Sequence, residues 1–110
     1  MAQELLAKLA VGEAKFTDVI AFIEERYTHI PTAFQNGAQS NAADQNQGSA
    51  KVFSFAKLNH LDQAQTLSLF AEHYTAVLNS AEATDHQNIR QFMLHGWEGI
   101  SFEGNALIAK

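Results

Sequence analysis

Apolar residues recur at helical spacing over one long stretch of this chain, from Asp62 to Leu78. Their separations place the side chains on one face of an α-helix. The residues on that face are Leu67, Phe70, Ala71, Tyr74, Val77 and Leu78. Asp62 at the start and Gln65 three residues later match the capping-box pattern of a helix N-terminus. The stretch therefore predicts a single helix from Asp62 to Leu78, with Phe70 in the core.

Three segments in the first half of the chain also show helical patterns. Residues 2–11 carry three leucines on one face, as an amphipathic helix does. A second helix is expected to use Thr17 as its N-cap and to end before Pro31, because proline removes a backbone donor. The segment 48–58 fits either a strand or a helix, and we favour a helix.

A last helix is predicted to end near His95. We expect Thr84 or Asp85 to be its N-cap, because short side-chain oxygens accept hydrogen bonds from the first turn. Gly96 then stands where a helix-ending glycine is common. The side chains expected to face inward are Ile89, Phe92 and Met93.

Two short segments have a strand-like pattern. "TAFQNG" (32–37) and "GISFEG" (99–104) each place a phenylalanine between polar neighbours and end in a glycine turn. We expect an antiparallel pairing near Phe34 and Phe102. The predicted fold class is α+β: a mostly helical single domain with a small antiparallel two-stranded element.

An amide-rich segment, Gln35 to Ala50, separates the second and third predicted helices. It contains no large apolar residue, so we expect it to be a loop. Sixteen residues are long for a structureless connection in a compact domain. Such loops are usually functional or mobile, which makes this segment a candidate binding loop.

Composition excludes several classes of protein. Seven basic and twelve acidic residues give a net charge of −5, and the basic residues are scattered, so we expect no nucleic-acid partner. The chain has no cysteine, which excludes disulfides and thiolate chemistry. It has no apolar run long enough to span a membrane and no secretory signal pattern, so we expect no membrane association and a cytoplasmic location.

The five histidines form no recognised metal motif. His86 and His95 are nine residues apart, and at about 100° per residue they fall on opposite sides of one helix. We therefore predict no metal site, and nothing in the sequence indicates a cofactor.

Three patterns could still belong to a site. His86 and Arg90 are four residues apart and share a helix face, near Asn88 and Trp97, although a capped helix with a surface pair and a core tryptophan also explains them. "NQGSAK" (46–51) is a helix start that could hold an anion on free N–H groups. "SFAK" (54–57) matches S-x-x-K, but its companion motifs are missing.

Five blocks of the sequence together resemble the HopJ type III effector family. They are "DVIAFIEERYTHIPTAFQNG", "NQGSAKVFSFAKLNHL", "AQTLSLFAEHY", "DHQNIRQFM" and "HGWEGISFEGNAL". The resemblance implies a HopJ-like domain over residues 1–110, with a core at 16–108 and an N-terminal helical extension at 1–15. It carries over no established biochemical activity. The family name leaves delivery by a type III secretion system open as an alternative to a cytoplasmic role.

These observations favour a non-enzymatic binding or interaction module for a small molecule or a protein partner, of unpredicted oligomeric state. The candidate binding residues are Asn36, Asn46, Ser49, Lys51, His86, Asn88, Arg90 and Trp97. The alternative is a small enzyme with His86 as general base and with Arg90 and Lys51 as anion-binding groups. A third hypothesis is dimerisation through an exposed aromatic patch.

Overall fold

The computed structural model describes residues 2–110 as six α-helices, one 3-10 helix and five short strands. The helices are α1 (Ala2–Ala10), α2 (Phe16–Arg26), α3 (Gln47–Leu58), α4 (Gln63–Ser68), α5 (Glu72–Leu78), α6 (Gln87–His95) and the 3-10 helix η1 (Gly96–Gly99). The strands are β1 (Tyr27–His29), β2 (Phe34–Asn36), β3 (Gln39–Asn41), β4 (Ile100–Phe102) and β5 (Leu107–Ala109). The predicted α+β class, mostly helical with a small antiparallel element, is confirmed.

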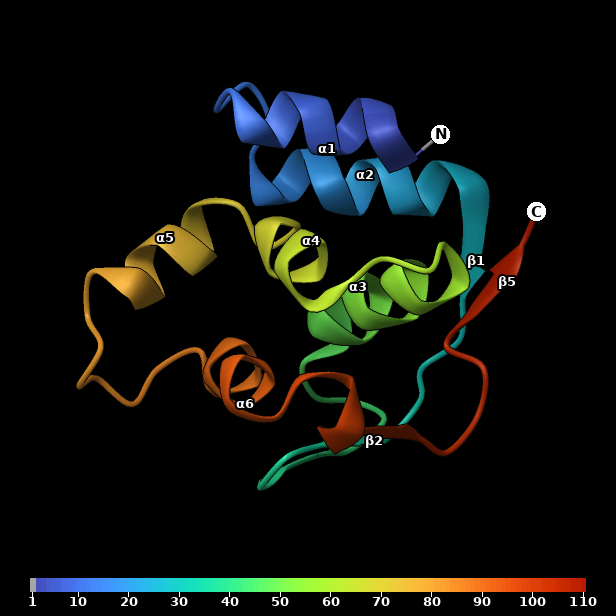
Figure 1. Cartoon of the computed structure of the whole chain (residues 1–110). Coiled ribbons are helices and arrows are strands. Elements are labelled where there is room, and N and C mark those ends of the chain that lie inside the picture. Colours follow the sequence, from blue (N-terminus) through green and yellow to red (C-terminus); the bar gives the residue numbers. More distant parts are fainter. Residues whose placement is uncertain (1) are drawn as a thin grey trace.

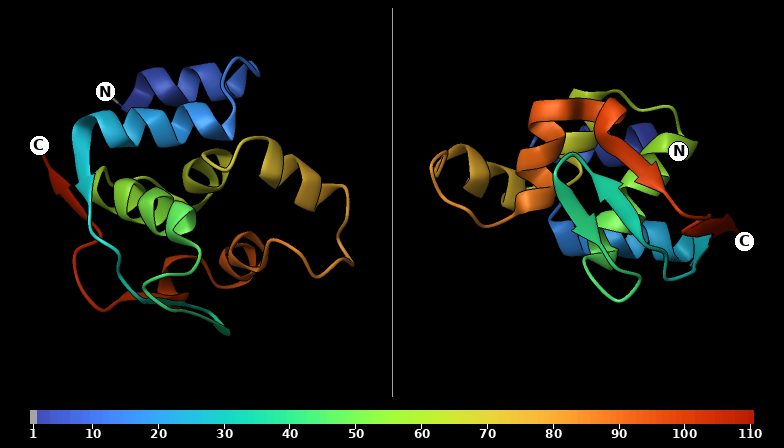
Figure 2. Two further views of the ribbon diagram at one scale, coloured as in Figure 1. Left: turned by 180° about the vertical axis from the view of Figure 1, so that it is seen from behind. Right: turned by 90° about the horizontal axis from the view of Figure 1, so that it is seen from below.

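Helix α3 lies at the centre of the molecule. Helices α1 and α2 run side by side along one side of it, and α6 with the β2–β3 hairpin lies on the other (Figure 1). Two further views show the same layering, with α5 and the loop after it projecting beyond the body (Figure 2). The start of α1 and the end of β5 lie toward the same end of the molecule (Figure 1).

The core is an aromatic cluster around Phe53 of α3. Its ring contacts those of Phe34, Phe70, Phe92 and Trp97, with centroids 4.9 to 6.4 Å apart. All five residues from Val52 to Ala56 are buried, so α3 is covered on every side. Because a helix this apolar needs partners all round, the other helices and the sheet pack against it.

The predicted pairing of Phe34 with Phe102 is confirmed, within a larger sheet. Strand β2 pairs antiparallel with β4, and the rings of Phe34 and Phe102 stack at 4.9 Å. Strand β2 also pairs with β3, which forms a hairpin across Gly37. The predicted loop at 35–50 is therefore wrong in part, because β3 lies within it, whereas the helix predicted at 48–58 is confirmed as α3. A separate two-stranded ribbon joins β1 to β5.

The single helix predicted from Asp62 to Leu78 is wrong. The Asp62–Gln65 capping box is present, but the chain breaks at Leu69–Ala71 into α4 and α5. Ala71 has a positive φ of 52°. The break lets Leu69 and Phe70 both become buried, and it turns Leu78 outward, where it is 54% exposed. Burying these two adjacent side chains stabilises the fold by more than the hydrogen bonds of an unbroken helix would, because an isolated helix is only marginally stable.

Two predicted helix starts are also corrected. Helix α2 begins at Phe16, and the Asp18 carboxylate accepts a hydrogen bond from the backbone of Lys15, so Thr17 is not the N-cap. Helix α6 begins after His86, which has a left-handed conformation, so neither Thr84 nor Asp85 caps it. The Asp85 carboxylate binds the guanidinium of Arg90 instead.

The inward face of α6 is narrower than predicted. Ile89 and Phe92 are buried as expected, and so is Asn88. Met93 is 37% exposed. The buried face is centred on Phe92, and the next residue along a helix lies about 100° around the axis. Met93 therefore falls at the edge of the core.

The Asn36–Gly37 turn is held firmly at both residues. The Asn36 side chain is fully buried, its amide donates to the Asn88 backbone carbonyl, and Gly37 N–H donates to the Gly99 carbonyl at 2.9 Å. We expect Asn36 to resist deamidation, because that reaction needs the Gly37 nitrogen to attack the Asn36 side chain. Mass spectrometry over days at mildly alkaline pH will measure the rate. The control is the same chain in urea, and equal rates in the two samples would contradict an ordered turn.

Candidate functional site

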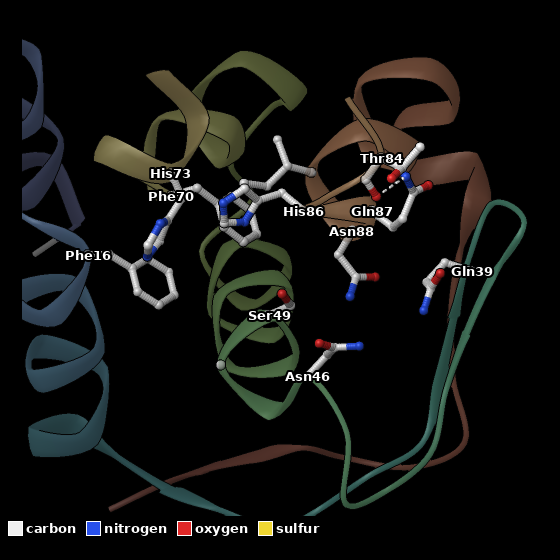
Figure 3. Close-up of a pocket in the computed structure, with 12 residues that line it drawn as sticks. Phe16, Gln39, Asn46, Ser49, Phe70, His73, Thr84, His86, Gln87 and Asn88 are labelled. Atoms are coloured by element: carbon white, nitrogen blue, oxygen red, sulfur yellow. Dashed lines mark hydrogen bonds between the residues drawn. The ribbon is translucent and has the colours of Figure 1, made fainter. Parts of the chain in front are cut away.

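A cavity of about 470 Å³ opens where α3 and α6 begin. Asn46 and Ser49 contribute from the start of α3, and His86 and Asn88 from the start of α6. The close-up shows these side chains around one hollow, with Gln39 of the hairpin along its edge (Figure 3). Three segments that are distant in sequence therefore form one pocket.

Two histidines form one wall of this pocket. The rings of His73 from α5 and His86 lie 5.1 Å apart at 35°, and Phe16 packs edge-on against His73 at 4.9 Å (Figure 3). Phe70 lies at the same side and stacks on Phe16. Among the described residues that line the pocket, none is acidic. We refer to this cavity as the His73–His86 pocket.

Both helices present unpaired backbone donors here. Asn46 and His86 precede α3 and α6 in left-handed conformations, with φ near 51° and 52°, and neither side chain caps its helix. The N–H groups of residues 47–49 and 87–88 have no acceptor among residues 2–110. Such groups carry partial positive charge, so this side of the pocket favours a negative group.

Behind the pocket, four asparagines form a hydrogen-bonded amide network. Asn88 Oδ1 accepts from Asn36 at 3.0 Å and from Asn41 at 3.2 Å, while Asn88 Nδ2 donates to Asn41 Oδ1 at 3.0 Å. Asn46 donates to Asn41 Oδ1 at 2.7 Å. The network joins β2, β3, α3 and α6. It fixes the side chains of Asn46 and Asn88 at the pocket floor.

Sequence reasoning missed most of the histidine and aromatic wall of the pocket, and it missed Asn41 in the network behind the pocket. Asn41 lies in a strand that was expected to be loop, and His73 lies on a helix whose direction depends on the break at Leu69–Ala71. The only sequence signal for Asn41 is the amide-rich composition around it. For His73 there is none, because its approach to His86 is purely tertiary.

Three of the eight predicted site residues lie away from the pocket. Lys51 pairs with Glu24 at 2.9 Å. Trp97 donates from its indole to the Leu61 carbonyl at 3.1 Å and packs on the core. Asn46, Ser49, His86 and Asn88 line the pocket, and Asn36 lies behind it.

Arg90 is the third predicted site residue that lies away from the pocket, and it holds the loop that leads into α6. Its guanidinium donates to the Asp85 carboxylate at 2.8 Å and to the Ala81 carbonyl and Ser80 hydroxyl. The hydrogen bond from the Arg90 guanidinium to the Asp85 carboxylate is the main reason why the pKa of Asp85 lies below its ordinary value. Arg90 therefore positions the segment before His86, and its own charge is already paired.

The fold and the pocket define a small α+β protein with a histidine-lined cavity. The chain belongs to the HopJ type III effector family: the family described as "HopJ type III effector protein" matches residues 2–107. This confirms the resemblance seen in the sequence blocks.

A solved structure has the same fold. It is described as "Crystal structure of unknown function protein VPA0580". Its sequence is 47% identical to that of this chain, and the two structures superpose with a TM-score of 0.91. The similarity covers 98% of this chain and 92% of that one. No curated protein matches the chain.

Two further properties concern the helices and the possible metal ligands of residues 2–110. None of the helices there combines the length and apolar character needed to cross a bilayer. No group of three or more histidine, aspartate or glutamate side chains in that range is placed to hold a metal ion.

Proposed function

We propose that this protein is a non-enzymatic binding module whose His73–His86 pocket takes a small ligand with an anionic group. The observation that carries the proposal is the pairing of two imidazoles at 5.1 Å in a pocket whose described lining has no acidic side chain. The unpaired N–H groups of α3 and α6 point to the same ligand charge. A cavity of about 470 Å³ is of the size that holds small molecules.

Two carboxylates stand near the histidines, and both are already engaged. Asp85 lies 3.9 Å from His86 Nε2 but is held by Arg90 at 2.8 Å. Glu72 accepts a hydrogen bond from the Phe16 backbone at 2.7 Å. Burial raises the pKa of the Glu72 carboxyl. The backbone hydrogen bonds and the nearby positive charges lower it by more in sum, so the pKa of Glu72 lies below its ordinary value. The imidazoles therefore stay available to a ligand anion.

The enzyme alternative receives less support from the same geometry. A general base needs an orienting acid within hydrogen-bond reach, and the 3.9 Å between Asp85 and His86 exceeds that reach. The two groups assigned to hold a substrate anion, Lys51 and Arg90, pair with Glu24 and Asp85. Dimerisation through an exposed aromatic patch is also unsupported, since no phenylalanine, tyrosine or tryptophan side chain within residues 2–110 is exposed.

Replacement of His86 tests the binding module. We expect phosphate or a small carboxylate to raise the melting temperature by several degrees at 100 times its dissociation constant, equivalent to about 2.7 kcal/mol. His86→Asn should fold normally, since asparagine tolerates the left-handed conformation, and should lose most of the effect.

His95→Asn is the matched control, because His95 is exposed and lies outside the pocket. It should keep the full ligand effect. The proposal is wrong if no anion in a panel of phosphates and carboxylates stabilises the unmodified protein. Equal losses in the two histidine variants would also exclude a site at His86. Unfolding of His86→Asn would make His86 a structural residue.

A further inference from the structure

A second cavity of about 410 Å³ lies between the C-terminal half of α3 and the segment that joins β4 to β5. Ser54, Lys57 and Leu58 face it from α3, and His60 follows just beyond the helix end. Phe102 and Leu107 form its other side. It shares no lining residue with the His73–His86 pocket.

The Ser54 hydroxyl at this cavity has no hydrogen-bond partner within residues 2–110. Ser54 is only 9% exposed, and its hydroxyl oxygen keeps some accessible surface at the cavity. A serine inside a helix commonly donates to the carbonyl four residues earlier, but no such bond is present here. The hydroxyl is therefore open to the cavity, where it can donate to a bound ligand.

Positive charge and apolar surface meet in the same cavity. Lys57 is three residues after Ser54, so both side chains lie on one face of α3. Lys57 forms no ion pair with any described residue, and no acidic residue lines the cavity. Leu58 is 52% exposed beside it, although an aliphatic side chain is more stable when covered.

We propose that this second cavity binds a carboxylic acid with a linear apolar chain. The carboxylate accepts hydrogen bonds from the Ser54 hydroxyl and the Lys57 ammonium, with the His60 imidazole at the rim. The apolar chain lies over Leu58, Phe102 and Leu107. The S-x-x-K pattern thus serves to hold an anion, with the serine as a hydrogen-bond donor.

Calorimetric titration of the full chain with butanoate, hexanoate and octanoate tests this proposal, with hexan-1-ol as the neutral comparison. Affinity should rise about fourfold for each added methylene that becomes buried, which corresponds to about 0.8 kcal/mol. Hexanoate should bind at least about fivefold more tightly than hexan-1-ol, because its charge meets Lys57. Equal affinity of acid and alcohol, or no binding of octanoate, would overturn the proposal.

Variants separate this site from the first pocket. Ser54→Ala and Lys57→Gln should each weaken hexanoate binding by about three- to tenfold, the loss of one hydrogen bond. Because the His73–His86 pocket is itself proposed to take small carboxylates, each titration is carried out in the His86→Asn background. In that background Lys8→Gln on α1 should leave hexanoate binding unchanged, because Lys8 does not line the cavity. Since Ser54→Ala removes a single oxygen, an unchanged melting temperature will show that its fold is intact. Unaltered hexanoate binding by Ser54→Ala would exclude a role for the hydroxyl.

Discussion

Replacing Phe53 with alanine is expected to lower the free energy of unfolding by about 3–5 kcal/mol. Phe53 is fully buried, and its ring packs against aromatic rings from β2, α6 and η1 and against Phe70. Alanine would leave a cavity that these rings cannot fill without moving. Urea denaturation followed by circular dichroism will give the change. A loss of this size is a large part of the roughly 5–15 kcal/mol that stabilises a typical domain.

Two companion variants keep this measurement interpretable. Phe53→Leu removes less volume and should fall between the wild type and alanine if the alanine variant fails to fold. Leu94→Ala deletes an exposed side chain on α6, where Leu94 is 74% exposed, and should change stability by less than about 0.5 kcal/mol. Similar urea midpoints for Phe53→Ala and Leu94→Ala would show that Phe53 is not the centre of the core.

Asn88→Ala is expected to cost about 2–3 kcal/mol, although it removes a polar side chain. The Asn88 side chain makes three hydrogen bonds with Asn36 and Asn41, and each contributes about 1 kcal/mol in a buried site. The Asn36 and Asn41 amides would lose these partners in the interior. The same variant should weaken ligand binding in the His73–His86 pocket, because Asn88 is part of its floor.

Asn105→Ala is the matched control, since Asn105 is exposed and makes no side-chain hydrogen bond within residues 2–110. Its unfolding midpoint should match that of the wild type. If Asn88→Ala and Asn105→Ala are equally stable, the asparagine network does not hold β2, β3 and α6 together. Its role at the pocket would then need another explanation.

Local patterns in the sequence predicted those elements whose stabilising contacts are local. The capping box at Asp62 and Gln65 needs only one helical turn, and it is present. The pairing of Phe34 with Phe102 is a longer-range prediction, but it rests on two similar strand patterns whose aromatic residues stack. Helix α1 likewise follows from the face that contains Leu5.

Predictions that depended on neighbours far along the chain were incomplete. The break between α4 and α5 occurs because the core accepts both Leu69 and Phe70, which the helical period alone does not indicate. The same reason explains where the predicted site residues lie. Asn46, Ser49, His86 and Asn88 belong to two helix starts that only the folded chain brings together, whereas Lys51 and Arg90 found partners elsewhere.

The sequence by itself determined the α+β class, the family and most helix positions, because side-chain periodicity and turn residues act over a few neighbouring residues. Only the tertiary structure decided where a ligand could bind. It placed His73 against His86, joined four asparagines across β2, β3, α3 and α6, and left Ser54 unpaired at a second cavity. These arrangements depend on how buried side chains fill the space around α3, since dense packing couples segments that are distant in sequence.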